Sequence, residues 1–161
     1  MHKTKISKKD EESLAKKVGG KRNLRSGGLW FSKGDVISPD YLFESKITFE
    51  TTFCLEKVII DKITTQALRY LKTPVVVVTL NPPKKISYSV VIINKKHCIG
   101  LENYKCLDII QYNKSFNLTY DLISNLVENS NSFLTLQTAE KDEYIILLLE
   151  NFLELANGTE T

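Results

Sequence analysis

The sequence has little of what membrane proteins, disulfide-bonded domains and zinc-binding domains contain. It has no run of about eighteen apolar residues, and its lysine-rich start has no apolar core, so we expect neither a membrane span nor a signal peptide. It has three widely spaced cysteines without a C-x-x-C pair, and two histidines. These counts argue against a disulfide framework and a histidine-based zinc site. We therefore expect a cytoplasmic protein, in the host cytoplasm if phage-encoded, whose cysteines are reduced packing residues.

Nucleotide-driven chemistry also lacks support in the sequence. The pairs Gly19-Gly20 and Gly27-Gly28 are not followed by the Lys-Ser/Thr that a G-x-x-x-x-G-K-[ST] phosphate loop needs. The length of 161 residues and the apolar content of 42% suit one domain with an ordinary core, here residues 1–161.

Positive charge is concentrated at one end of the chain. The net charge is only +3, but residues 1–34 contain ten Lys and Arg against three acids, which is +7 and leaves −4 for the remainder. A basic segment of this kind favours a phosphate backbone through counterion release, although a solvated tail is the plainer interpretation. The candidate DNA-binding residues are Lys16, Lys17, Lys21, Arg22, Arg25 and Lys33.

Periodicity predicts an α/β or α+β protein with a central mixed β-sheet flanked by helices. Residues 1–10 form a basic N-terminal segment, and Ser7 resembles a helix N-cap. The helix ends at Gly19-Gly20 and carries Glu11 on its apolar stripe, where an acid needs a cation or a metal. The other expected elements are a hairpin of 35–37 and 41–47, a helix capped by Thr51 or Thr52, strands 75–80, 86–93, 106–112 and 133–137, and a helix 120–128.

Two parts of the chain are less defined by their pattern. Residues 144–149 are predicted to form either a buried strand, followed by a helix over 150–156, or the first part of one continuous helix. Periodicity does not distinguish these two alternatives. The apolar side chains near 144–155 are also a candidate dimer surface. Residues 97–132 are an insertion or extension that no motif places.

The predicted hairpin carries the residues with the clearest chemistry. Side chains alternate along a strand, so Glu44 and Lys46 point to one face, and Asp35 on the first strand falls roughly across from Glu44. Two carboxylates and a lysine suit phosphodiester hydrolysis, because hard oxygen ligands hold Mg²⁺ and the lysine orients water or neutralises charge. The alternative is an ordinary surface ion pair worth about 0–1 kcal/mol. Asp40, in the turn, is too far along to join them.

Over residues 11–48 the motifs E-x-x-L-A-K-K-V-G-G, R-x-x-x-S-G-G, K-G-D-V and F-E-S-K-I-T occur in this order. With these motifs the chain resembles the PD-(D/E)XK nuclease superfamily, and most closely its phage and archaeal Holliday-junction resolvase-like branch. The resemblance implies a restriction-endonuclease-like core. It is fainter at 55–59 and 75–80 and at the end of the chain, and residues 97–132 match nothing in the family.

The resemblance also implies a role for individual residues. Asp35 and Glu44 would be the metal-binding pair, Ser45 would donate its backbone carbonyl to the ion, and Lys46 would be the catalytic lysine. Glu11 would be the acid of the helix and a further metal ligand, and Ser26 and Arg22 would contact the scissile phosphate region. The sequence departs from the family at Arg25, where related phage sequences often carry a small residue, and at Ser45, where a cysteine or other small residue is common.

These observations favour a Mg²⁺-dependent, structure-selective DNA endonuclease, with Mn²⁺ as a substitute metal. A four-way DNA junction as partner implies a homodimer that places two sites on two strands. A restriction-type or repair nuclease on the same core remains open. So does a non-catalytic DNA-binding protein in which the acids are surface charges and the basic segment supplies the affinity.

Overall fold

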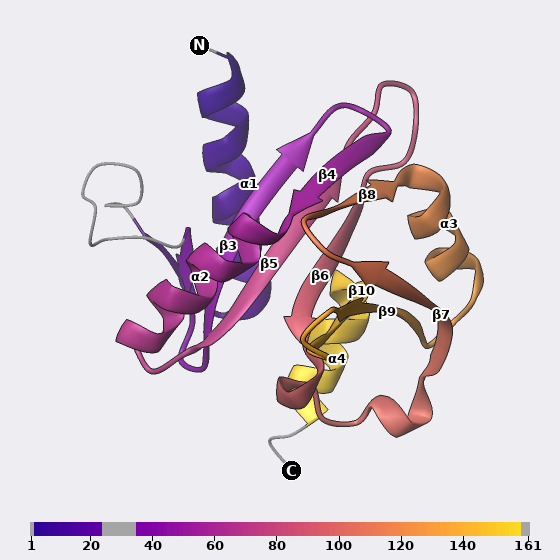
Figure 1. Ribbon diagram of the computed structural model, residues 1–161. Helices are drawn as coiled ribbons and strands as arrows, with labels where there is room; N and C mark the ends of the chain where they lie inside the picture. The colour runs from indigo at the N-terminus through magenta and orange to yellow at the C-terminus, as the bar shows by residue number, and fades with distance from the viewer. Residues whose placement is uncertain (1, 24–34, 159–161) are drawn as a thin grey trace.

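We describe the protein from a computed structural model, in which residues 2–23 and 35–158 are described (Figure 1). Along the chain the elements are α1 (His2–Val18), β1 (Lys21–Arg22), β2 (Val36–Ile37), β3 (Tyr41–Thr48), β4 (Thr52–Glu56), α2 (Lys57–Arg69), β5 (Thr73–Leu80), β6 (Tyr88–Asn94), the 3₁₀ turns η1 (Lys95–His97) and η2 (Leu101–Asn103), β7 (Lys105–Tyr112), β8 (Ser115–Thr119), α3 (Tyr120–Glu128), β9 (Ser132–Thr138), β10 (Glu143–Leu148) and α4 (Leu149–Gly158).

A large mixed sheet forms the centre of the described part of the chain. Its strand order is β1-β2-β3-β5-β6-β10-β9-β7. The pairs β3–β5 and β7–β9 are parallel, and the other neighbours are antiparallel. The strands β4 and β8 form a separate antiparallel pair. The α/β class with a central mixed sheet flanked by helices is therefore confirmed.

Each face of the sheet has its own apolar core. The first is covered by α2, α3 and the β4–β8 pair, and the second by α1 and α4 (Figure 1). Strand β5 lies between them, so its side chains alternate between the two cores, as a run of β-branched residues allows. The first core includes Leu42, Ile63, Val76, Val78 and Ile92, and the second includes Leu14, Phe43, Val77, Ile145 and Phe152.

Several predicted elements are confirmed by the structure. The hairpin of β2 and β3 pairs Val36 with Phe43 and Ile37 with Leu42. The helix predicted for residues 120–128 has these bounds in the structure, and the hydroxyl of Thr119 caps it by accepting from the backbone N–H of Leu122 at 3.2 Å. The strands predicted at 75–80, 86–93, 106–112 and 133–137 are present as β5, β6, β7 and β9.

The prediction for the first helix was correct at its end and wrong at its start. Helix α1 ends at Val18, and Gly19 follows with a φ of 64°, which a glycine adopts without strain. The helix begins at His2, so Ser7 is not an N-cap and residues 2–10 are part of the helix. Lysines are good helix formers, which lets the helix extend upstream of the expected cap.

The helix predicted to start from Thr51 or Thr52 was also wrong in its first part. Thr52–Glu56 is strand β4, and α2 begins only at Lys57. Strand β4 pairs with β8, which the sequence pattern did not predict, and this long-range pairing overrides the local helical pattern. In β4 the side chain of Leu55 is fully buried while Cys54 and Glu56 are exposed, as in a strand with one covered face.

Residues 97–132, which no motif placed, extend the sheet and complete its first core. They contain β7 at the sheet edge, β8 and α3. All three cysteines are free, but Cys54 and Cys106 are exposed, so the prediction that they are packing residues was wrong for these two.

The end of the chain consists of a strand and a helix, which is the first of the two alternatives. Most of the apolar side chains near 144–155 are buried, among them Ile145, Ile146, Leu147 and Phe152. These four side chains form the interior, so they cannot contribute to the candidate dimer surface. Among the described residues no helix is long and apolar enough to cross a membrane.

Candidate functional site

The hairpin of β2 and β3 brings Asp35 to the side of Glu44. The register Val36 with Phe43 places Asp35, one residue before Val36, next to Glu44, one residue after Phe43. The backbone N–H of Asp35 donates to the carbonyl of Phe43 at 2.8 Å. The backbone N–H of Ser45 donates to Asp35 Oδ2 at 2.7 Å. The Asp35 carboxylate is therefore held against β3 by a backbone donor.

Glu44 and Lys46 form an ion pair on the same face of β3. Lys46 Nζ lies 3.1 Å from Glu44 Oε1, and the side chain of Glu44 is only 14% exposed. An exposed ion pair on a strand is common and contributes about 0–1 kcal/mol. Here the largely covered carboxylate of Glu44 lies beside the carboxylate of Asp35. An ordinary surface ion pair has no such second carboxylate.

The surroundings of Asp35 disfavour the ionised form of its carboxyl. Burial raises the pKa of its carboxyl to about 7, and the negative charge of Glu44 is the next largest cause. The hydrogen bond from Ser45 opposes this shift, Glu11 adds to it, and Lys46 opposes it weakly. A carboxylate whose pKa is raised by burial and by other acids is a candidate functional group, because such perturbed groups cluster at functional sites.

Helix α1 contributes Glu11 to the neighbourhood of the hairpin. Glu11 is buried, as its place on the apolar stripe predicts, and Glu12, one step round the helix, is exposed. Arg22 Nε donates to Glu11 Oε2 at 2.7 Å, and the hydroxyl of Ser7 donates to Glu11 Oε1 at 3.4 Å. The cation that compensates Glu11 in this structure is therefore Arg22.

The sequence did not single out Asp10 as a member of this cluster. Its Oδ2 accepts a hydrogen bond from the hydroxyl of Ser45 at 2.8 Å, which joins α1 directly to β3. Burial raises the pKa of Asp10, while the bond from Ser45 and the charge of Lys17 lower it. One signal could have found this residue: Asp10 lies four positions before Leu14, on the buried side of the helix.

The donor atoms at the hairpin suit a hard divalent cation. Among the described residues no group of three or more His, Cys, Asp and Glu side chains is arranged to hold a metal ion. Mg²⁺, however, is commonly bound through one or two carboxylates together with water and substrate oxygens. The carboxylates of Asp35 and Glu44, and the backbone carbonyl of Ser45 directly after Glu44 in sequence, offer oxygen donors only.

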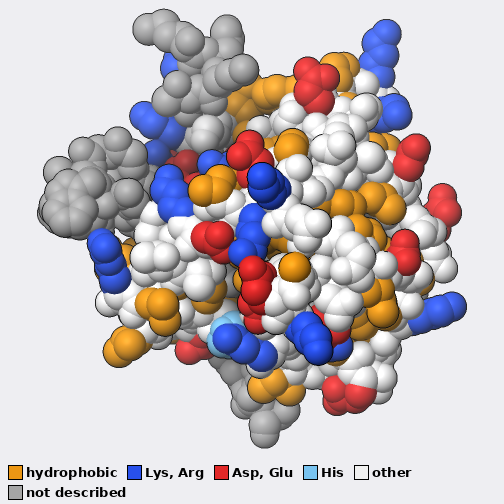
Figure 2. Space-filling view, viewed as in Figure 1, with side chains coloured by type: hydrophobic (Ala, Val, Ile, Leu, Met, Phe, Trp, Pro, Cys, Tyr) orange, Lys and Arg blue, Asp and Glu red, His pale blue; other side chains and the backbone are white. Residues whose placement is uncertain are grey.

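The predicted DNA-binding residues are only partly described. Lys16, Lys17 and Lys21 are exposed near the end of α1 and in β1. On the face of the molecule that Figure 2 shows, Lys and Arg side chains are intermingled with acidic ones. Arg22 is partly covered and is paired with Glu11. Ser26, Arg25 and Lys33 lie outside the described residues.

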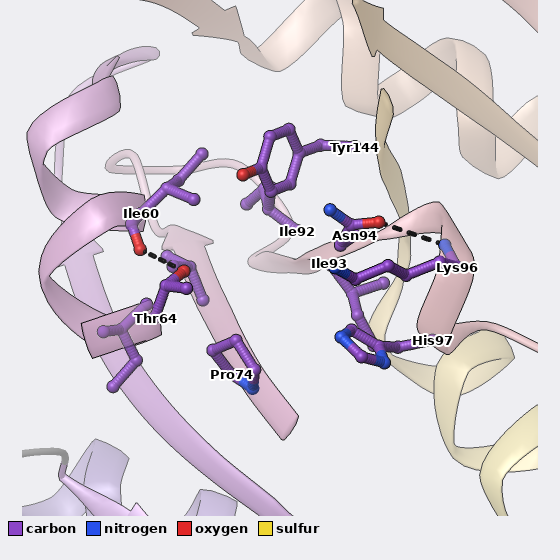
Figure 3. Close-up of a pocket in the computed structure, with 11 residues that line it drawn as sticks. Ile60, Thr64, Pro74, Ile92, Ile93, Asn94, Lys96, His97 and Tyr144 are labelled. Carbon is purple, nitrogen blue, oxygen red and sulfur yellow. Dashed lines mark hydrogen bonds between the residues drawn. The ribbon is translucent and has the colours of Figure 1, made fainter. Parts of the chain in front are cut away.

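A small cavity of about 50 Å³ lies away from the hairpin, between α2, β6 and η1 (Figure 3). Its lining includes Thr64, Asn94, Lys96 and His97, and it contains no carboxylate. Burial and the neighbouring Lys96 lower the pKa of His97. The cavity has room for a few waters at most, and its chemistry is unrelated to the carboxylate cluster.

Comparison with known proteins finds a partial structural likeness and no match at the level of sequence. No protein-family model matches the sequence. No curated protein matches it either. Among solved structures, the chain is similar to Hjc, a Holliday junction resolvase from the archaeal hyperthermophile Archaeoglobus fulgidus, with a TM-score of 0.41 and 19% identity over 50% of this chain and 72% of that one.

Proposed function

We propose that this protein is a Mg²⁺-dependent DNA endonuclease with a restriction-endonuclease-like core, selective for branched DNA in the manner of a Holliday-junction resolvase. The observation that carries the proposal is the pair of carboxylates on the β2–β3 hairpin. Asp35 is held by the Ser45 amide beside Glu44, and Glu44 is paired with Lys46. The selectivity for junctions rests on the sequence motifs of residues 11–48 alone.

In the proposed reaction, some residues of the hairpin would bind the metal ion and Lys46 would act on the water and the phosphate. Asp35, Glu44 and the carbonyl of Ser45 would hold Mg²⁺, or Mn²⁺ in its place, and Glu11 would complete the acidic cluster. When bound, the ion supplies a Lewis acid for the phosphate and lowers the pKa of a water. Lys46, whose Nζ lies 3.1 Å from Glu44 Oε1, would orient the attacking water or neutralise the charge that develops on the phosphate.

The remaining residues bind and position the DNA. The exposed ammonium groups of Lys16, Lys17 and Lys21 provide sequence-independent attraction to the phosphate backbone. Arg22, fixed by Glu11 at 2.7 Å, would contact the scissile phosphate together with Ser26. A four-way junction has two-fold symmetry, so a homodimer would place one hairpin at each of two strands.

A cleavage assay tests the proposal. Wild type and the Asp35→Asn variant are incubated with a synthetic four-way junction and with a linear duplex of matched sequence, in Mg²⁺ and in EDTA. Paired, symmetric nicks on the junction that require Mg²⁺ and Asp35 support a resolvase. Asp40→Asn is the matched control, because Asp40 is exposed in the hairpin turn and should leave cutting unchanged.

The other outcomes of the assay favour the alternatives. Cutting of both substrates would indicate a restriction-type or repair nuclease on the same core. Binding of DNA without cutting of either substrate, and unchanged binding by Asp35→Asn, would indicate a non-catalytic DNA-binding protein.

A second measurement tests the metal site without using activity. Thermal unfolding is followed with and without Mg²⁺, Mn²⁺ or Ca²⁺. An ion that binds the folded state stabilises it by about 1.4 kcal/mol at ten times its Kd. We expect a rise in Tm for wild type and a much smaller one for the double variant Asp35→Asn, Glu44→Gln. Equal rises in both proteins would place the ion elsewhere.

A further inference from the structure

A cavity of about 400 Å³ adjoins the candidate nuclease site on the side of α1 and the β3–β4 turn. It shares Ser45 and Lys46 with that site, and its other walls come from the first half of α1 and from residues 47–50. The volume falls in the range of about 300–1,000 Å³ that small-ligand sites have. A DNA strand whose phosphate lay at Lys46 would pass its neighbouring nucleotide over this cavity.

The walls of the cavity suit a flat, uncharged group. Ile6 and Ile47 are apolar, and the ring of Phe49 lies on the turn and is 39% exposed. This exposure leaves part of the ring open to the cavity and to solvent. An exposed ring on the wall of a cavity offers a stacking surface, and stacking on an aromatic side chain is available to every base.

The rim of the cavity carries hydrogen-bonding groups but little positive charge. Its cation is Lys46, which is already paired with Glu44 at 3.1 Å, and Glu50 adds a negative charge. A phosphate would be repelled by Glu50 and is therefore not the occupant. The hydroxyl of Thr48 and the carboxylate of Glu50 can instead face the polar edge of a base.

The turn that carries Phe49 is braced by hydrogen bonds. The backbone N–H of Glu50 donates to Thr48 Oγ1 at 3.1 Å, and the backbone N–H of Asn81 donates to the carbonyl of Thr48 at 2.8 Å. The ring therefore stands on a supported turn, and less conformational freedom is lost when a base stacks on it.

We propose that this cavity is a subsite for an unpaired nucleobase next to the phosphate that is cut, with Phe49 as its stacking partner. The inference rests on the proposed nuclease function and deepens it. In a continuous duplex each base is paired and stacked between its neighbours, so the subsite takes a base that is unpaired at a gap or that the protein unpairs at a branch point, where stacking is interrupted. Phe49 is then a residue that helps to select branched or gapped DNA over duplex.

The first test measures affinity, separately from cutting. A fluorescein-labelled four-way junction and a duplex with a one-nucleotide gap are titrated with protein in Ca²⁺, and anisotropy gives Kd. We expect Phe49→Leu to weaken binding of these two probes by about 5- to 150-fold, the effect of losing one stacked base. Phe49→Trp should retain binding, and no variant should change the Kd for fully paired duplex. The control Val58→Ala removes an apolar side chain that is 63% exposed on α2 and should have no effect.

The second test locates the base directly. The gapped duplex and the junction carry 5-iodouracil at the unpaired or branch-point position, and irradiation cross-links it to an aromatic ring in contact with it. We expect a cross-link to the peptide that contains Phe49, lost in Phe49→Leu and retained in Phe49→Trp. Cross-links only to other peptides, together with an unchanged Kd for Phe49→Leu, would overturn the subsite.

Cleavage of the same probes by wild type in Mg²⁺ separates this inference from the proposed function. If wild type cuts the junction while Phe49→Leu binds and cross-links like wild type, the subsite is wrong and the nuclease stands. If wild type cuts no probe but cross-links through Phe49, the base-binding site stands and the nuclease function is wrong.

Discussion

The hydroxyl of Ser45 donates a hydrogen bond to the carboxylate of Asp10 at 2.8 Å, across 35 positions of sequence. This bond links α1, which carries Glu11, to β3, which carries Glu44 and Lys46. The backbone N–H of the same Ser45 donates to Asp35. Ser45 of β3 is therefore bonded both to Asp10 of α1, the neighbour of Glu11, and to Asp35 at the start of the hairpin.

A double-mutant cycle measures what this connection contributes. Asp10→Ala, Ser45→Ala and the double variant are unfolded in urea, and the interaction energy is taken from the four free energies. We expect a coupling of about 1–2 kcal/mol, since the acceptor is a carboxylate. The exposed neighbour Glu12→Gln should change stability by less than about 0.5 kcal/mol. A coupling close to zero would mean that the bond does not hold the helix to the strand.

The raised pKa of Asp35 predicts a pH dependence of stability without metal. In the unfolded chain its carboxyl ionises near the ordinary value of about 3.9, and in the folded protein near 7. Folding takes up a proton between these values, so the contribution of Asp35 is fully present below about pH 4 and is lost as the pH rises through 7. The free energy of unfolding of wild type and of Asp35→Asn is measured in EDTA at pH 4 and at pH 8. From pH 4 to pH 8 the difference between the two proteins should shift in favour of Asp35→Asn by roughly 1–3 kcal/mol. Parallel unfolding curves at all pH values would contradict the pKa shift.

Gly20 sets how closely the turn after α1 approaches β2. A Cβ added at Gly20 would lie 2.6 Å from the carbonyl oxygen of Ile37. This oxygen belongs to the backbone of β2, so it cannot move away without shifting the strand. We expect Gly20→Ala to cost about 1–3 kcal/mol in the free energy of unfolding. At Gly158 an added Cβ meets nothing within 4 Å, so Gly158→Ala is the control and should be neutral or slightly stabilising. Equal effects of the two substitutions would show that the contact with Ile37 is unimportant.

The exposed lysines of α1 and β1 predict the salt dependence of DNA binding. Replacing Lys16, Lys17 and Lys21 by Gln should reduce the slope of log K against log salt by up to about 0.9 for each lost phosphate contact. The affinity for all DNA structures should fall together, because phosphate contacts carry no base information. A control with the same charge change replaces Lys62 on α2, Lys114 between β7 and β8, and Lys141 between β9 and β10, all of them exposed. The same loss of slope in both triple variants would indicate that only net charge matters.

Local patterns predicted the elements that depend on neighbours in sequence. The alternation of Leu42, Glu44 and Lys46 along one strand was enough to place Glu44 and Lys46 together, and the structure brings them to 3.1 Å. The turn at Ser38-Pro39-Asp40 indicated a hairpin with Asp35 beside Glu44, and the register agrees. The roles of these residues in metal binding and catalysis stay predictions.

Contacts between segments that are distant in sequence could not be predicted from local patterns. Strand β4 depends on β8, more than fifty residues later, and its own sequence allowed a helix. The bond between Asp10 and Ser45 depends on how α1 packs on the sheet, and the exposure of Phe49 on a cavity wall depends on where Ile6 lies.

The sequence by itself determined the periodic elements, the hairpin and the face on which its charged side chains lie, because turns and alternation are set by the backbone within a few residues. Only the tertiary structure decided which strands pair across the chain, that Arg22 is the partner of Glu11, and that Asp35 is covered enough to raise its pKa to about 7. Burial and charge compensation are properties of the packed molecule, since they sum over groups that the chain brings together only on folding.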